Sequence, residues 1–183
     1  MKAVFKMLQV TLLGVAMSPA YAADIGSPKE LGVALEHAAL CKAGAADAFD
    51  ARDKRVRQNL VRLGVKVHGD ADDGPWDFGY VFPAGVSAFG YDVKAAGYSG
   101  DSGSIFYVQI AAAEADLDRL KDSLQLAPIP KAHRSDYLVD GAGYAKPVHP
   151  PTEDDPYPDT VVAGLQHKDG KTYLVVGCQT FDY

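Results

Sequence analysis

The sequence predicts an α+β domain in which two N-terminal helices and a short third helix pack on a single antiparallel sheet of about five strands. Three observations support this prediction. Apolar residues recur at helical spacing over residues 28–63, alternation typical of strands begins after Val65, and turn-forming residues separate the later strands. The resulting order of two helices, three strands, one helix and two strands is typical of helices packed on an antiparallel sheet.

Residues 1–22 have the parts of a secretory signal peptide. A positive start at Lys2 and Lys6 precedes a mostly apolar stretch, and Ala20-Tyr21-Ala22 gives the small-residue pattern at which such leaders are cleaved. The apolar stretch is shorter than the roughly 18 residues that a membrane anchor needs. We therefore expect a periplasmic or secreted protein whose mature part, residues 23–183, is one globular domain.

Three helices are expected. The first begins after Ser27, because Ser27-Pro28-Lys29-Glu30 is a capping-box pattern with proline at the first helical position. A second helix fits residues 45–63, with Gly64 as its C-terminal cap. A third covers residues 114–124. Leucines and other apolar residues recur at helical spacing in the first and third: Leu31, Ala34, Ala38, Cys41, Leu117, Leu120 and Leu124.

Five strands are expected where apolar and other residues alternate. They cover residues 76–82, 86–98, 104–111, 160–166 and 171–181. Turn-forming residues at 98–103 and 168–170 make two hairpins. Residues 127–159 contain seven prolines, which exclude a long regular element, and a loop of this length is usually functional or mobile.

The net charge argues against some classes of partner, and the two cysteines predict a disulfide. Without Lys2 and Lys6 the mature chain has 16 basic and 24 acidic residues, a formal charge of −8. This balance argues against nucleic acid or an anionic membrane as partner and permits a basic protein. The two cysteines, Cys41 and Cys178, are expected to form a disulfide in an oxidising compartment, joining the first helix to the last strand.

Gly100-Asp101-Ser102-Gly103 resembles the nucleophile segment of trypsin-like serine proteases, and this resemblance implies a nucleophilic Ser102. Such an enzyme also needs a histidine base and a buried aspartate. Only His37 and His68 precede Ser102, neither lies in that family's histidine box, and the chain is too short for two barrels. A hairpin turn accounts for the tetrapeptide, so a hydrolase using Ser102 is the least favoured reading.

Residues 102–107 resemble the Ser-Gly…Tyr loop of bacterial periplasmic lysozyme inhibitors, which enters the lysozyme cleft. The resemblance implies partner contacts by Ser102 and Tyr107. The second motif of those inhibitors, Tyr followed by Lys-Gly, is not found here. The two expected N-terminal helices also depart from the small all-β barrels of those inhibitors.

Neither a metal nor a cofactor is expected. Asp70, Asp72, Asp73 and Asp77 form an acidic loop, but an EF-hand starting at Asp70 would have glycine and proline at its fifth and sixth positions, so a solvated turn is the better interpretation. The histidines lack the spacing of a zinc site, and there is no phosphate-binding or dinucleotide-binding loop.

These features favour binding over catalysis. We hypothesise an exported inhibitor or immunity-type protein that binds a toxin or cell-wall hydrolase; the alternative is a small-molecule or envelope-component binding protein. Tyrosine, tryptophan and acidic residues on loops suit protein recognition, although Trp76 and Tyr157 fit a core role equally well. The candidate binding residues are Asp70, Asp72, Asp73, Trp76, Tyr98, Asp101, Ser102, Tyr107, Asp154, Asp155 and Tyr157.

Overall fold

The structure is a computed structural model, which describes residues 25–69, 76–101, 103–111, 114–168 and 170–181. Its helices are α1 (Pro28–Ala39), η1 (Ala46–Phe49), α2 (Lys54–Arg62), α3 (Glu114–Leu124) and η2 (Lys131–Asp136), where η marks a 3-10 helix. Its strands are β1 (Lys66–His68), β2 (Trp76–Val81), β3 (Ser87–Ala88), β4 (Tyr91–Gly100), β5 (Ser104–Ile110), β6 (Ala127–Pro128), β7 (Ala142–Pro147), β8 (Thr160–Lys168) and β9 (Lys171–Thr180).

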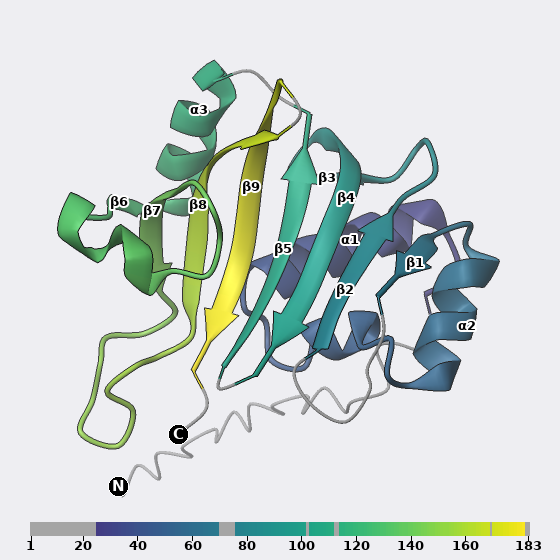
Figure 1. The fold of residues 1–183 in the computed structure, drawn as a ribbon, viewed down its shortest axis with the longest axis horizontal. Coiled ribbons are helices and arrows are strands. Elements are labelled where there is room, and N and C mark those ends of the chain that lie inside the picture. The colour runs from purple at the N-terminus through teal and green to yellow at the C-terminus, as the bar shows by residue number, and fades with distance from the viewer. Residues whose placement is uncertain (1–24, 70–75, 102, 112–113, 169, 182–183) are drawn as a thin grey trace, which may run out of the picture.

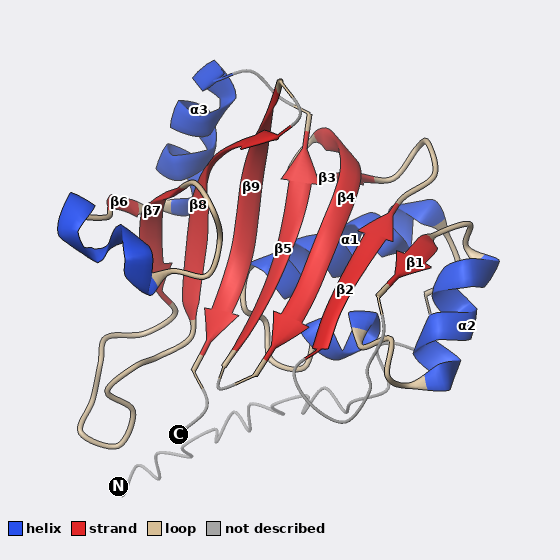
Figure 2. Ribbon diagram, viewed as in Figure 1, coloured by secondary structure: helices blue, strands red, loops and turns tan. Residues whose placement is uncertain are grey.

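The strands of the described residues form one antiparallel sheet in the order β1-β2-β4-β5-β9-β8-β7-β6, with β3 paired to β4 (Figures 1 and 2). β5 and β9 are neighbours although they are far apart in sequence. Their register runs from Ser104 opposite Thr180 to Ile110 opposite Leu174. This pairing joins an N-terminal group of strands, β1 to β5, to a C-terminal group, β6 to β9.

The predicted fold, with a single sheet of about five strands, is wrong, because the described residues form a sheet of nine strands. Three of the four missed strands, β1, β3 and β6, have only two or three residues, too few to show alternation. β3 is separated from β4 by a two-residue turn at Phe89 and Gly90, both with positive φ. The fourth missed strand, β7, ends on Pro147. The pairing of β7 with β6 stops at Ala145, so the N–H that Pro147 lacks is not needed for a hydrogen bond to β6.

The segment predicted as one helix over residues 45–63 is divided into η1 and α2. Two aspartates explain the break, because each side chain accepts a hydrogen bond from a backbone N–H two residues further on. Asp50 accepts from Arg52, and Asp53, the N-cap of α2, accepts from Arg55 at 2.7 Å. Such local bonds compete with a continuous helix.

The helices α1, η1 and α3 pack on one face of the sheet. Figure 1 shows α1 crossing behind the strands, and the residues of the sheet that face it form the main core with Leu31, Leu35 and Phe49. We call this side the helix face; it carries Phe78 and Phe106. The rings of Phe49 and Phe106 lie 4.8 Å apart.

The opposite side, here called the open face, is covered only in part. A second apolar cluster on this face lies beneath residues 129–139 and includes Ile105, Val162 and Val175. In front of β2 and β4 the described chain places no helix (Figure 1). Tyr107 of β5 lies there, with its ring so close over Gly97 that a β-carbon at that position would be 2.5 Å from it.

The predicted disulfide between Cys41 and Cys178 is confirmed. It joins the residues that follow α1 to β9, with 5.0 Å between the two Cα atoms and 137 residues of sequence separation. Among the described residues, no helix is long and apolar enough to cross a membrane.

Replacing both cysteines by alanine should lower the free energy of unfolding by about 4–5 kcal/mol, because the disulfide closes a very long loop in the unfolded chain. Urea denaturation of the oxidised protein and the Cys41→Ala/Cys178→Ala variant measures this difference. Chemical reduction of the natural sequence is the control and should give the same loss. Coincident unfolding midpoints would contradict the prediction.

Candidate functional site

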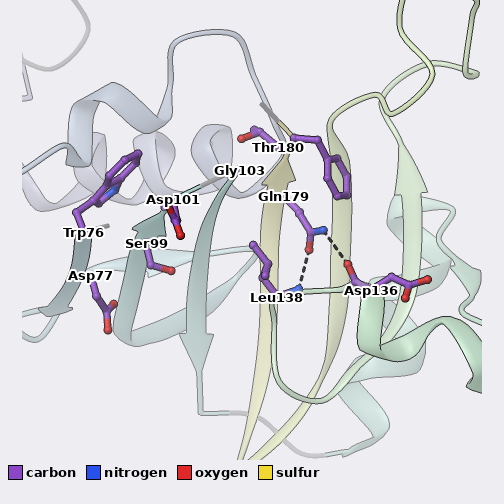
Figure 3. Close-up of a pocket in the computed structure, with 11 residues that line it drawn as sticks. Trp76, Asp77, Ser99, Asp101, Gly103, Asp136, Leu138, Gln179 and Thr180 are labelled. Carbon is purple, nitrogen blue, oxygen red and sulfur yellow. Dashed lines mark hydrogen bonds between the residues drawn. The ribbon is translucent and has the colours of Figure 1, made fainter. Parts of the chain in front are cut away.

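A groove of about 560 Å³ lies at the end of the sheet, near the turn between β4 and β5 (Figure 3). The ends of β2 and β4 form one wall, and the last residue of η2 and the segment after it form the other. The end of β9 lies between the two walls. The lining residues are Trp76, Asp77, Ser99, Gly100, Asp101, Gly103, Asp136, Leu138, Gln179, Thr180 and Phe181.

Gln179 holds the second wall in place. Its side chain is almost fully buried, yet both ends of the amide are satisfied by backbone groups. Oε1 accepts a hydrogen bond from the N–H of Leu138 at 2.8 Å, and Nε2 donates to the carbonyl of Asp136 at 3.1 Å (Figure 3). The side chain therefore pairs with residues 136–138 much as a neighbouring strand would, and it fixes Asp136 and Leu138 at the groove.

Trp76, the only tryptophan of the chain, lies at the edge of the first wall. Its ring lies against Gly100 of β4, where a β-carbon would be 2.3 Å from the indole. The guanidinium of Arg52 stacks on the same ring at 3.7 Å, and two hydrogen bonds from its Nε and Nη2 to Asp50 hold it there. The hydrogen bond to Asp50 raises the pKa of Arg52. The indole Nε1 is buried and has no hydrogen-bond partner among the described residues.

The groove is acidic. Asp77, Asp101 and Asp136 line it, and its lining includes no lysine or arginine among the described residues. The carboxylate of Asp136 lies 3.1 Å from the exposed side chain of His133, which belongs to the same helix, η2. Burial, with the charge of Asp77, raises the pKa of the Tyr107 phenol on the adjacent open face, so this side chain stays neutral at ordinary pH. A cationic group would be favoured in this groove.

A second cavity of about 300 Å³ adjoins the groove, because Asp136 and Phe181 line both. Its wall is rich in aromatic and proline residues, and the ring of Tyr157 lies 6.2 Å from that of Phe181. Its remaining lining residues are His133, Tyr137, Pro147, Pro151, Pro156, Pro158 and Thr160.

The Pro-rich loop that carries Tyr157 is closed by hydrogen bonds. The N–H of Val148 donates to the carbonyl of Asp159 at 2.8 Å, at the base of the loop. Near its tip, the N–H of Asp155 donates to the hydroxyl of Thr152, and the Asp155 carboxylate lies 3.0 Å from His149. The loop therefore has a defined path.

The structure brings some of the predicted site residues together and separates others. Trp76 and Asp101 line the groove, and Tyr157 lines the adjoining cavity. Tyr98 lies in the main core on the helix face, and Tyr107 on the open face. Asp154 and Asp155 belong to the Pro-rich loop and line neither cavity. The remaining four, Asp70, Asp72, Asp73 and Ser102, lie outside the described residues.

Several groove residues were missed by sequence reasoning: Asp136, Leu138, Gln179 and Phe181. One signal for Gln179 was present, since it is the polar residue that follows the apolar run of β9. Asp136 and Leu138 carry no such signal, because their hydrogen bonds to Gln179 span 43 and 41 residues of sequence. A contact of that range does not appear in local periodicity.

The described residues hold no group of three or more histidine, cysteine, aspartate or glutamate side chains that could bind a metal ion. Ser102 lies outside the described residues, so a hydrolase using it stays a prediction. No protein-family model, no curated protein and no solved structure matches the chain. The function is therefore inferred from the groove and the cavity beside it.

Gln179→Leu should destabilise the protein by about 1–3 kcal/mol, because the N–H of Leu138 and the carbonyl of Asp136 lose their partner. Hydrogen exchange at the Leu138 amide should accelerate at the same time. Urea denaturation and amide exchange measure the two effects. Gln58→Leu on the exposed surface of α2 is the matched control and should change neither. Unchanged exchange at Leu138 in Gln179→Leu would show that another contact fixes this wall.

Gly100→Ala should displace the Trp76 ring, because the new β-carbon would overlap the indole. We expect the tryptophan emission to shift to the red and stability to fall by about 1–3 kcal/mol. Gly143→Ala in β7 is the matched control, since nothing lies within 4 Å of its β-carbon position. An unshifted emission spectrum in Gly100→Ala would mean that Trp76 does not lie on Gly100 in solution.

Proposed function

We propose that the chain is an exported binding protein of the inhibitor or immunity type, whose groove receives a basic side chain of a toxin or cell-wall hydrolase. The observation that carries this proposal is that Asp77, Asp101 and Asp136 line the groove, and that no lysine or arginine is among its described lining residues. Lysine and arginine complement such a site in charge, and arginine also in its flat, many-donor geometry.

Apolar contact is available beside the carboxylates. Leu138, on the groove wall, is 60 % exposed, and the partly buried Trp76, which packs against the main core, lines the opposite edge. A protein interface typically combines such apolar anchors with charged groups whose desolvation strengthens the pairing. The mature formal charge of −8 would also speed the approach of a basic partner.

Two observations support export. Cys41 and Cys178 form a disulfide, a bond that persists mainly in oxidising compartments. The first 22 residues, which lie outside the described ones, have the sequence pattern of a secretory leader.

A small-molecule or envelope-component ligand is the second candidate. The groove volume of about 560 Å³ falls within the range of ligand pockets. Its three carboxylates would select a cationic compound. A protein partner accounts better for the exposed apolar side chains around the groove, such as Leu138.

A charge-removal experiment with a matched control tests the proposal. The mature protein is immobilised, partners are captured from a periplasmic and culture extract of the producing organism, and the affinity of each purified partner is measured. Asp77→Asn/Asp101→Asn/Asp136→Asn should weaken binding on the order of 30-fold, because three negative charges are lost from the groove lining. Asp92→Asn/Asp118→Asn/Asp122→Asn makes the same change in net charge away from the groove and should weaken binding by about threefold or less.

Equal losses in the two triple variants would show that net charge, and not the groove, attracts the partner. A partner affinity that is unchanged in both triple variants would overturn the proposal. Binding by the natural sequence should also weaken as salt is raised, because charge pairs contribute to it.

A further inference from the structure

We propose that the partner is held through an extended, basic, proline-containing segment that lies along the groove and the adjoining cavity. This inference rests on the proposed function and specifies the form of the partner at the same site. The groove and the cavity share Asp136 and Phe181, so together they form one trough. The trough has an acidic end at Asp77 and Asp101 and an aromatic end at Tyr157.

The aromatic end has the chemistry of sites that bind polyproline II segments. Such sites are shallow grooves whose aromatic rings contact proline rings, and the ligand loses little entropy because it is already extended. Here Tyr137, Tyr157 and Phe181 supply the rings. Tyr157 is 57 % exposed, a large fraction for an aromatic side chain on a loop that several hydrogen bonds close.

The rings at the aromatic end are held by the fold. Phe181 directly follows β9. Gln179, two residues earlier, is hydrogen-bonded to Asp136 and Leu138, the residues on either side of Tyr137. The wall of the Pro-rich loop is fixed at its base by the hydrogen bond between Val148 and Asp159. Such a preorganised site loses little conformational entropy on binding.

The acidic end sets the charge of the segment. Asp77 and Asp101 line one end of the trough, and Asp136 lines its middle. Among the described lining residues the one basic group is His133, and it lies 3.1 Å from the Asp136 carboxylate. A segment with arginine or lysine close in sequence to proline satisfies both ends at once. A polyproline II helix repeats every three residues, so a cation at every third position presents one charged edge and leaves prolines on the others.

Three labelled peptides of nine residues test the inference by fluorescence anisotropy on the mature protein. One repeats Arg-Pro-Pro, one repeats Arg-Gly-Gly with the same charge, and one repeats Glu-Pro-Pro with the opposite charge. The Arg-Pro-Pro peptide should bind saturably and at least about tenfold more tightly than the Arg-Gly-Gly peptide. The Glu-Pro-Pro peptide should show no saturable binding.

Two variants locate the binding. Tyr157→Ala should weaken the Arg-Pro-Pro peptide about tenfold and change the Arg-Gly-Gly peptide little, because the lost ring contacts proline. Val61→Ala on α2 removes an apolar side chain of similar exposure, 58 %, away from the trough and should change neither. Equal affinity of the two arginine peptides, or equal behaviour of the two variants, would overturn the inference.

The two proposals can fail separately. If binding of a captured partner depends on the three carboxylates but not on Tyr157, the inference of an extended segment is overturned and the proposed function stands. The opposite result is that partner binding does not depend on the carboxylates while binding of the Arg-Pro-Pro peptide depends on Tyr157. It would overturn the proposed function and leave the inference of a peptide-binding trough standing.

Discussion

The pairing of β5 with β9 is the constraint on which the rest of the structure depends. It joins the strands before α3 to the strands after it, and so makes one sheet from two groups of strands. Cys178 lies in this central pair, opposite Phe106, and its bond to Cys41 fastens the end of α1 to the same place. Such long-range pairing is slow and costly in entropy to form, and a crosslink over 137 residues offsets part of that loss.

The same pair positions the candidate site. Because β9 pairs with β5 where the two groups of strands meet, its last residues reach the β4–β5 turn on one side and residues 136–138 on the other. In Gln179 the cost of burying a polar side chain is offset by the hydrogen bonds that it makes. A buried amide lowers stability unless it is fully hydrogen-bonded, and here both ends are satisfied by backbone groups of the groove wall. The polar residue in β9 therefore stabilises the wall that carries Asp136 and Leu138.

The groove and the cavity beside it differ in chemistry but share residues. The groove end concentrates carboxylates beside an exposed leucine, and the cavity end presents aromatic rings and prolines. A cation alone would use only the first, and an apolar ligand only the second. An extended basic segment with prolines uses both, which connects the proposed inhibitor or immunity role to a definite form of partner. The disulfide and the leader-like start of the sequence support the proposal that this encounter takes place outside the cytoplasm.

The sequence by itself determined the features that depend on short stretches or on residue identity. Ser27 caps α1 as its neighbours predict, α3 occupies residues 114–124, and Cys41 bonds to Cys178 because only two cysteines are present. Trp76 and Asp101 were identified as candidates from their residue types alone. Tertiary structure decided the number of strands, because strands of two or three residues form only when a neighbouring strand supplies hydrogen bonds. It also decided that Tyr98 is in the core while Asp136 lines the groove together with Asp77. Gln179 fixes the second wall of the groove through hydrogen bonds that span more than 40 residues, and no local pattern records them.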